Sequence, residues 1–284
     1  MQLYSINTGY FKLDGGAMHG VVPKALWQKY NPADDNNMCS WAMRCLLIDN
    51  GRQRILVDNG IGNKQDAKFF SYYYLHGNDS LEKSLHAVGC GYDEVTDNFL
   101  THLHFDHCGG GVHYANNNPE RPALTFANAR YWTNQQHLQW ALQPNAREKV
   151  SFLKDNIVPM QQSGHLHFVD LAGQTAQPFE GIEVIPVNGH TEQQMLLKIQ
   201  YKQYTVLYCA DLIPSVAHVR LPWVMAFDVR PLDTLAEKAR VLNEAADNGY
   251  VLFFEHDPLH ECCTVKHTAK GVQVNETFPL SALG

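Results

Sequence analysis

The stretch Thr101-His102-Leu103-His104-Phe105-Asp106-His107-Cys108-Gly109-Gly110 decides how this chain is interpreted. It places three imidazoles and one carboxylate within six positions, directly after the apolar pair Phe99-Leu100. Four metal-capable side chains this close together cannot all be satisfied by packing in a core. Imidazole and carboxylate ligands together suit Zn, Fe or Mn, and the lack of thiolates in the pattern argues against a closed structural zinc site. The stretch therefore predicts a catalytic metal centre at the end of a strand.

The composition predicts a soluble globular protein. Hydrophobic residues make up 45% of the 284 positions and charged residues 18%. A formal net charge of -7 gives no basic footprint, so we expect no nucleic-acid partner. No apolar run approaches the roughly 20 residues of a membrane helix, so we also expect no membrane partner. Seven irregularly placed cysteines without a Cys-x-x-Cys pair favour reduced thiols and a cytoplasmic location.

Short strand-like runs alternate with helical patterns, which predicts an α/β fold. We expect a single domain over residues 1–284, because no linker divides the chain. A hairpin is predicted where residues 44–49 and 54–58 flank Asn50-Gly51. Periodicity further predicts helices over 80–88, 129–142, 147–160 and 232–247, strands over 182–185, 195–199, 204–208 and 251–254, and a last hairpin joining 264–265 to 272–274.

More ligands are expected at other strand ends, because one cluster cannot fill the coordination spheres of two metals. Three polar residues each come soon after a predicted apolar strand, namely His190, Asp211 and His256. Side chains at such positions converge on a site at the edge of a sheet. Each residue alone is a weak signal, but the serial pattern predicts that all three contribute to the metal centre.

The complete pattern resembles that of the metallo-β-lactamase fold hydrolases. It consists of His102-x-His104-x-Asp106-His107, then Gly189-His190-Thr191, then Asp211 and then His256, over roughly residues 40–260. Asp58 also fits, since that superfamily carries an aspartate after an early strand. Within the superfamily, residues 103–107 and 14–18 most resemble the branch of the acyl-homoserine lactonases, to which organophosphate hydrolases are related.

The resemblance implies a four-layer αββα sandwich with mixed sheets and two divalent metal ions, zinc being expected and iron or manganese being alternatives. His102, His104 and His190 would bind the first metal, and Asp106, His107 and His256 the second, with Asp211 bridging both. A metal-bridging hydroxide would attack a small-molecule ester or lactone. Asp106 would be catalytic as the proton shuttle, the alternative being that it is only a ligand.

Several functions remain open at this point. Within enzymes, the alternatives are phosphodi- or phosphotriester hydrolysis and thioester hydrolysis like that of glyoxalase II. A metal-retaining protein that binds a ligand or regulates is an alternative of another class, because a fold does not fix a function.

Two departures from the superfamily pattern concern the substrate. Glu192-Gln193-Gln194 stands where Pro-Gly-His often follows the Gly-His-Thr motif. Pro214 stands three residues after Asp211, where acyl-homoserine lactonases commonly have a tyrosine that polarises the lactone carbonyl. Tyr208 lies in a predicted strand and is expected in the core. The second departure weakens the lactonase prediction but leaves the hydrolase prediction intact.

Two segments rich in aromatic residues, 14–41 and 69–74, are expected to cover the site. Within and beside them, His19, Phe69 and Phe105 are the predicted substrate-binding residues, because small-molecule pockets usually have apolar walls with few polar groups. The alternatives are a surface position for His19 and core packing for the aromatic side chains. A homodimer contact is a further use for residues 69–74.

Overall fold

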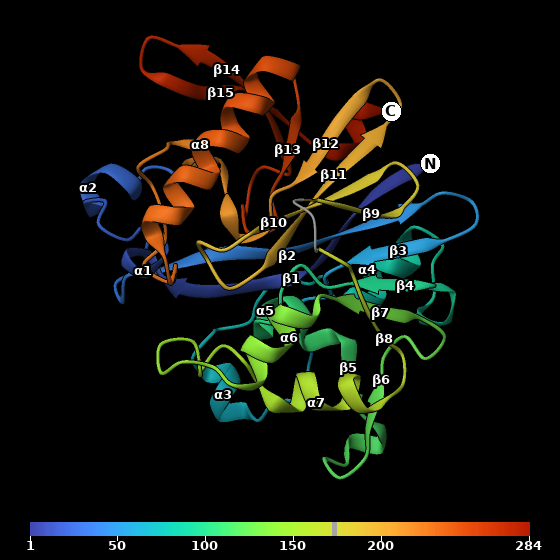
Figure 1. Ribbon diagram of the computed structural model, residues 1–284. Helices are drawn as coiled ribbons and strands as arrows, with labels where there is room; N and C mark the ends of the chain where they lie inside the picture. Colours follow the sequence, from blue (N-terminus) through green and yellow to red (C-terminus); the bar gives the residue numbers. More distant parts are fainter. Residues whose placement is uncertain (172–174) are drawn as a thin grey trace. The chain divides into compact units, whose positions relative to one another are not determined.

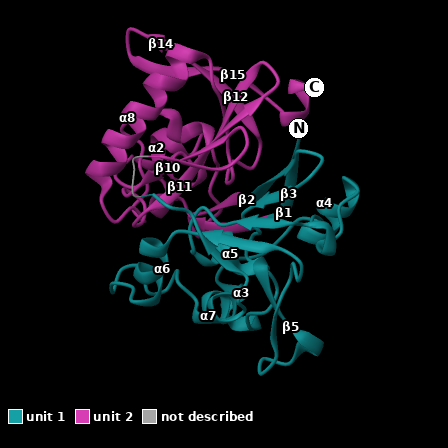
Figure 2. Ribbon diagram, turned by 45° about the vertical axis from the view of Figure 1, so that its right-hand side comes forward, with its two compact units in different colours: residues 1–9, 43–173 teal, residues 10–42, 174–284 magenta. Residues whose placement is uncertain are grey.

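The computed structural model describes residues 1–171 and 175–284. Figure 1 shows the chain coloured along its sequence. Two compact units are built from interleaved segments, with residues 1–9 and 43–173 in unit 1 and residues 10–42 and 174–284 in unit 2. Figure 2 shows the two units in different colours. Strands β1 (Gln2–Asp14) and β2 (Met38–Asp49) each contribute residues to both units. No single linker therefore separates the units along the sequence.

The sheet of unit 1 places two strand ends beside each other. Its order is β1-β2-β3-β4-β7-β8, with β3 (Arg54–Val57), β4 (Asp97–Phe99), β7 (Arg130–Thr133) and β8 (Leu166–Phe168). Strands β2 and β3 form the predicted antiparallel hairpin, whereas β3, β4, β7 and β8 run parallel. Because parallel strands end at the same edge, Asp58 after β3 and Thr101 after β4 come together there.

Short helices cover this sheet with their apolar faces. Leu85, Leu138 and Ile157 belong to one buried cluster with strand residues such as Leu56 and Tyr131. The helices of the unit are α3 (Ala67–Ser71), α4 (Leu81–Ala87), α5 (Phe105–Cys108), α6 (Gln135–Leu142) and α7 (Lys154–Gln162), with the 3-10 turns η1 (Tyr92–Glu94), η2 (Gly109–Gly111) and η3 (Ala115–Asn117) and the small hairpin β5 (Val112–Tyr114) and β6 (Pro122–Leu124).

Two helix predictions in this unit are wrong in part. The helix predicted over 129–142 begins only at Gln135, because residues 130–133 form β7 and pair with β4. Aromatic and β-branched side chains at Tyr131 to Thr133 favour the strand, and the Asn134 side chain accepts a hydrogen bond from the His137 amide at 2.8 Å to start the helix. The helix predicted over 147–160 begins only at Lys154.

The sheet of unit 2 has the order β15-β14-β13-β12-β11-β10-β9. Strands β12 and β13 are parallel, and the other neighbours are antiparallel. The strands are β9 (Ala176–Phe179), β10 (Ile182–Val187), β11 (Gln194–Tyr201), β12 (Tyr204–Tyr208), β13 (Val251–Phe253), β14 (Cys262–Thr268) and β15 (Gly271–Phe278). All the strands predicted in this half are found, including the last hairpin.

Helix α8 (Pro231–Asn248) packs against β14 and ends at Gly249, whose φ of 66° is left-handed. The remaining elements of the unit are α1 (Gly15–His19), α2 (Lys24–Trp27), η4 (Ala210–Leu212), η5 (Val216–Val219) and η6 (Leu280–Leu283). Among the helices of the described residues, none is both long and apolar enough to cross a membrane. The cytoplasmic location stays a prediction.

A buried lysine ties α8 to the loop that follows η5. Lys238 is fully buried, and its ammonium group donates to the carbonyls of Arg220, Leu221 and Trp223 at 3.1, 3.3 and 2.6 Å. Burial lowers the pKa of Lys238 to about 7. The three acceptors offset part of this desolvation and fix the loop that leads on to Asp228.

Replacing this lysine should destabilise the protein. In Lys238→Met, three carbonyl groups lose their common donor, so we expect the free energy of unfolding to fall by about 2–4 kcal/mol. Denaturant titration measures the change. The control is Lys198→Met, which removes a partly exposed ion pair with Glu244 at 2.8 Å and should cost less than about 1 kcal/mol. Equal losses in the two variants would contradict the anchoring role.

Candidate metal centre

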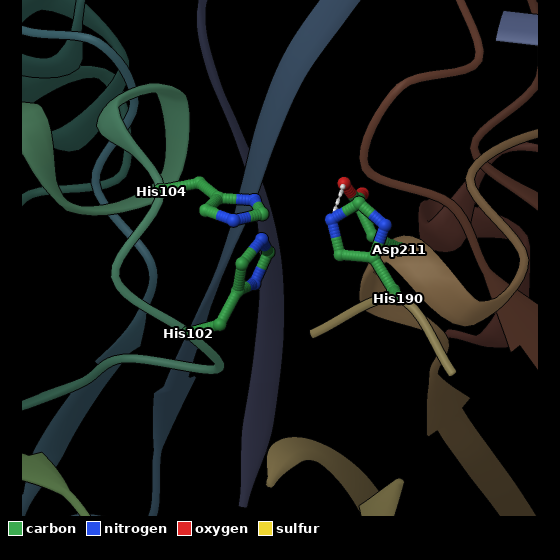
Figure 3. Close-up of side chains that lie close together, drawn as sticks. All are labelled: His102, His104, His190 and Asp211. Atoms are coloured by element: carbon green, nitrogen blue, oxygen red, sulfur yellow. Dashed lines mark ion pairs between the residues drawn. The ribbon is translucent and has the colours of Figure 1, made fainter. Parts of the chain in front are cut away.

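In unit 1, the four metal-capable residues of the central motif lie close together in the short segment 102–107. His102 follows β4, His104 immediately precedes α5, and Asp106 and His107 lie inside α5. All four are less than 9% exposed. The His102 and His104 rings meet edge to face with centroids 4.6 Å apart (Figure 3), and each ring offers a nitrogen within 4.8 Å of one on the other. Asp106 Oδ2 lies 3.8 Å from His107 Nε2.

The Asp58 carboxylate organises this group from behind. It is fully buried and accepts from the Thr101 amide at 2.8 Å and from the Thr101 hydroxyl at 2.7 Å. Its Oδ2 also lies 3.2 Å from His107 Nδ1, while the Thr101 hydroxyl lies 3.0 Å from His102 Nδ1. Asp58 therefore orients the His107 ring directly and the His102 ring through the Thr101 hydroxyl, in both cases from the Nδ1 side. The Nε2 atoms of the two rings are thereby turned toward the other metal-capable side chains.

Glycines allow α5 to approach the loop that carries Asp58. A Cβ atom on Gly109 would lie 2.1 Å from the Ile61 carbonyl oxygen, and one on Gly62, whose φ is 71°, would lie 2.5 Å from the Gly109 carbonyl oxygen. The Asn59 amide also donates to the His107 carbonyl at 2.9 Å. This backbone contact explains why the histidine motif is followed by glycines.

Sequence reasoning missed two neighbours of the motif. Glu148 Oε1 lies 3.6 Å from His104 Nε2, and the Trp140 indole donates to Glu148 Oε2 at 2.8 Å. His137 Nε2 accepts from the Leu103 amide at 2.9 Å, so that imidazole is neutral with its proton on Nδ1. Neither residue has a spacing that relates it to the motif, because helix α6 brings His137 there and the turn between α6 and α7 brings Glu148.

Unit 2 brings the other three predicted ligands together, with His190 and His256 both beside the Asp211 carboxylate. His190 Nε2 lies 3.1 Å from Asp211 Oδ2, the pair joined by the dashed line in Figure 3. His256 Nε2 lies 3.1 Å from Asp211 Oδ1. The carboxylate thus faces one imidazole with each of its oxygens, and all three residues are buried.

Acceptors behind these two rings fix their orientation as well. His190 Nδ1 lies 3.0 Å from Asp228 Oδ1, and His256 Nδ1 lies 2.8 Å from the Ala42 carbonyl oxygen. A carbonyl can only accept, so His256 carries a proton on Nδ1 and presents Nε2 toward Asp211. Asp228 is a functional neighbour that no sequence motif indicated.

Charged side chains hold the loop at the Gly-His-Thr motif. Glu192, which stands in place of the proline, pairs with Arg230 at 2.6 Å. Arg230 also donates to the Asn188 carbonyl at 2.8 Å, and Glu237 of α8 accepts from the Asn188 amide at 2.7 Å. The start of α8 therefore anchors this loop through charged side chains.

The second departure from the superfamily pattern is Pro214, which stands three residues after Asp211. Pro214 does not present a side-chain donor, but its carbonyl accepts from the His256 amide at 3.1 Å. Tyr208 is fully buried and donates to Glu255 at 2.6 Å, as expected of a core residue. Neither residue replaces the tyrosine of the lactonases.

The predicted substrate-binding residues of unit 1 form one aromatic cluster. The Phe105 ring lies 5.4 Å from Phe69 and 4.7 Å from Tyr73, centroid to centroid. Burial and then the charge of Asp106 raise the pKa of Tyr73 to about 12. Phe105 directly precedes Asp106 in the chain, so the cluster borders that residue. Tyr72 and Tyr74 of the same segment are 59% and 52% exposed, and the homodimer stays a prediction.

His19 is not on the surface. It is fully buried in unit 2, stacked between Trp27 at 5.0 Å and His218 at 4.9 Å, centroid to centroid. Burial lowers the pKa of His19 to about 4, so the imidazole is neutral near pH 7. The surface alternative for this residue is thus wrong.

The donor set fits divalent metal ions of borderline softness. It consists of imidazoles directed by acceptors behind them and of carboxylates. The adjacent thiols are poor candidates, because burial raises the pKa of Cys108 to about 12 and holds that of Cys209 well above its usual range. The fold and these His/Asp clusters imply divalent metal ions.

Comparison with known proteins gives consistent matches. The model of the Metallo-beta-lactamase superfamily matches residues 44–256. A probable metal-dependent hydrolase from Staphylococcus aureus aligns with a TM-score of 0.87 and 26% identity over 98% of this chain and 96% of that chain. A dizinc quorum-quenching lactonase in complex with a product gives 0.76 and 23% over 98% and 95%. An N-acyl homoserine lactone lactonase gives 0.67 and 20% over 90% and 92%. No curated protein matches the sequence. The matches confirm the predicted metallo-β-lactamase fold with its mixed sheets.

The Asp58→Asn variant should lose metal affinity without losing its fold. Asparagine tolerates the left-handed backbone at this position, where φ is 58°, but its amide nitrogen cannot accept from Thr101 and His107. We expect metal affinity to fall by about 10–100-fold, measured by competition with a chromophoric chelator. Asp247→Asn, on an exposed carboxylate paired with His267, is the control, and equal affinities in the two variants would refute this role.

Acid should destabilise the protein partly through His19. Its pKa is about 4 in the folded chain, against 6.5 for an unperturbed histidine, so between these values the unfolded chain binds a proton that the folded chain does not. The stability contribution is complete above pH 6.5 and decreases as the pH falls toward 4.

Removing this ionisable group should flatten the pH dependence. In His19→Phe, the loss of unfolding free energy across the same interval should be smaller by up to about 3 kcal/mol. Denaturant titration of chelator-treated protein measures it, which removes the effect of metal release. His218, whose pKa is also lowered by burial, titrates in both proteins. An unchanged pH profile would show that His19 is not shielded from protonation.

Proposed function

Because this chain belongs to the metallo-β-lactamase superfamily, we propose that it is a dinuclear metal-dependent hydrolase of a small-molecule ester or lactone. The observation that carries the proposal is the Asp211 carboxylate, which faces His190 with one oxygen and His256 with the other, each at 3.1 Å. With one oxygen toward each imidazole, this carboxylate would be able to help hold both ions.

The family pattern assigns the other ligands to two ions. His102 and His104 would join His190 in holding the first ion, and Asp106 and His107 would join His256 in holding the second. We propose zinc, because the donors are nitrogen and oxygen atoms and a structurally similar lactonase is a dizinc protein. When bound, the two ions would supply Lewis acidity and a water activated for attack at neutral pH.

The protein residues orient the reaction and move its proton. Asp106 takes the proton from the attacking water on a carboxylate oxygen and returns it to the leaving oxygen. The neutral imidazoles do not compete for that proton, because acceptors behind the rings hold their tautomers. The cluster of Phe69, Tyr73 and Phe105, which borders Asp106, forms an apolar wall for an acyl chain and limits access of water.

The charges around the ligands favour a neutral substrate. Asp58, Glu148 and Asp228 all lie behind imidazoles of the two ligand groups, and the net charge of the chain is -7. These carboxylates would offset much of the charge of two divalent ions, so little net positive charge would remain to attract an anion. A neutral phosphotriester is the second candidate, because Pro214 replaces the tyrosine that would favour a lactone carbonyl.

Metal content measured together with a substrate screen tests the proposal. Protein purified without added metal should hold about two equivalents per chain by plasma mass spectrometry and should hydrolyse lactones or esters faster than phosphotriesters. Chelation should abolish turnover. At most one equivalent after reconstitution with zinc, manganese or iron would refute the dinuclear centre, and activity on phosphotriesters alone would favour the second candidate.

Asp106→Asn separates the shuttle from a simple ligand. Loss of proton transfer should lower kcat by about 10²–10⁴-fold even when the metal content has been restored. If excess metal restores turnover, Asp106 is only a ligand. His102→Ala is the companion variant, and a biological effect that survives in both variants would favour a binding or regulatory protein over an enzyme.

A further inference from the structure

Gln194 is a fully buried glutamine whose side chain contacts the backbone of a predicted metal ligand. Its amide group lies against two backbone N–H groups, that of Asp211 at 2.8 Å and that of Leu212 at 3.2 Å. Backbone N–H groups can only donate, so the atom that faces them is the side-chain oxygen, which accepts from both. Gln194 therefore holds the 3-10 turn η4, in which Asp211 lies.

The register of the strands explains why a side chain makes this contact. Strands β11 and β12 pair as far as Leu197 and Tyr208. The same register, continued by three residues on each strand, would bring Gln194 opposite Asp211. Strand β12 ends before that point, however, and Ala210 has a left-handed φ of 42°. Because the ladder cannot continue through this turn, the longer reach of a glutamine side chain supplies the acceptor in place of a strand carbonyl.

Gln194 also closes the loop that carries His190. It is the first residue of β11 and pairs with Val187, the last residue of β10. The loop over 188–193 between them contains His190, whose Nε2 lies 3.1 Å from Asp211 Oδ2 (Figure 3). One buried side chain thus joins the base of the His190 loop to the turn of Asp211.

We propose that Gln194 is a positioning residue, which fixes the direction of the Asp211 carboxylate through the backbone of η4. The inference rests on the proposed function, because it takes Asp211 to help hold the ions. An aspartate side chain is short, so a shift of the turn would move both oxygens relative to His190 and His256. Groups that orient metal ligands commonly change the affinity for the metal by about 10–100-fold.

Glutamine suits this role better than the histidine that the superfamily pattern often has at this position. Its side-chain oxygen is a neutral acceptor that does not titrate. An imidazole is itself a good ligand for zinc, iron or copper, whereas a carbonyl oxygen suits harder ions. Gln194 therefore contacts the Asp211 backbone without competing with Asp211 for a transition metal.

Hydrogen exchange in metal-free Gln194→Met tests the contact itself. Methionine keeps the length and burial of the side chain but has no oxygen acceptor. The Asp211 amide should exchange with deuterium about tenfold faster than in the parent, measured residue by residue by NMR. The Cys209 amide, which donates to the Phe253 carbonyl at 3.1 Å, should keep its rate. An unchanged rate at Asp211, or an equal increase at Cys209, would overturn the local role.

Metal binding shows whether the turn positions the carboxylate. We expect Gln194→Met to bind zinc about 10–100-fold more weakly than the parent, measured by competition with a chromophoric chelator. The visible spectrum of the cobalt-substituted protein should change as well, because Asp211 meets the ion differently. Gln194→Glu retains an oxygen acceptor at the same reach, so it should restore slow exchange of the Asp211 amide and most of the affinity.

Gln200→Met is the matched control. Gln200 lies in the same strand, is exposed, and accepts from the Thr205 hydroxyl at 3.3 Å. This variant should keep the cobalt spectrum of the parent and a zinc affinity within about twofold of it. Affinity and spectrum like those of the parent in Gln194→Met would overturn the proposal, and so would an equal loss of affinity in Gln200→Met.

Failure of the proposed function gives a different result. If the parent holds zinc but hydrolyses no ester or lactone, the proposed activity is refuted and the zinc affinities still decide the role of Gln194. If the parent binds no metal after reconstitution, the metal centre is refuted. Hydrogen exchange in the metal-free proteins then decides whether Gln194 holds the turn: faster exchange confined to Asp211 supports it, and an unchanged rate overturns it.

Discussion

Buried acceptors that fix the direction of imidazole rings govern the organisation of both units. A histidine binds a metal only through a deprotonated nitrogen, so the other nitrogen must hold the proton and point away. Asp58 does this for His107, Asp228 for His190 and the Ala42 carbonyl for His256. Each acceptor comes from a different segment of its unit. The contacts that form when each unit folds therefore also orient its metal-capable imidazole rings.

Two residues beside these groups, Asp58 and Ala210, have strained backbone conformations. Asp58 has a φ of 58°, and Ala210, directly before Asp211, has a φ of 42°. Left-handed conformations are unfavourable for residues with a Cβ atom and persist only where the surroundings determine them. At Asp58 three hydrogen-bond donors supply this determination. Strain at two strand ends beside the ligands thus reflects a requirement of the site.

The buried aromatic cluster of unit 2 follows a related logic. His218 is satisfied by a carbonyl and a hydroxyl, whereas the ring stacked on it leaves two nitrogens without a partner. Packing forces alone would favour an apolar ring there, because burying an unsatisfied polar group is costly. A polar ring at this position therefore costs stability that an apolar ring would not.

The order of residues along the chain was sufficient to predict the family, the fold and the succession of ligand-type residues. Seven such residues, in the loops and short helices that follow strands, leave few other interpretations, because core packing does not call for dense clusters of imidazoles and carboxylates. The hairpin of β2 and β3 and the long helix α8 could also be predicted from the sequence. Asn50-Gly51 favours a turn and Gly249 ends the helix through their own backbone conformations, which do not depend on distant segments. The boundary between β7 and α6 was not, because pairing with β4 decided it.

Tertiary packing, by contrast, selects the residues that stand behind the ligands and sets the position of His19. Asp228 and Glu148 are ordinary acidic residues in the sequence, and they acquire their roles because the fold places each beside one imidazole. His19 is flanked by residues that suggest a loop on the surface, yet stacking by Trp27 and His218 buries it completely. Local patterns identify the ligand-type residues, whereas the environment of a side chain depends on segments distant along the chain.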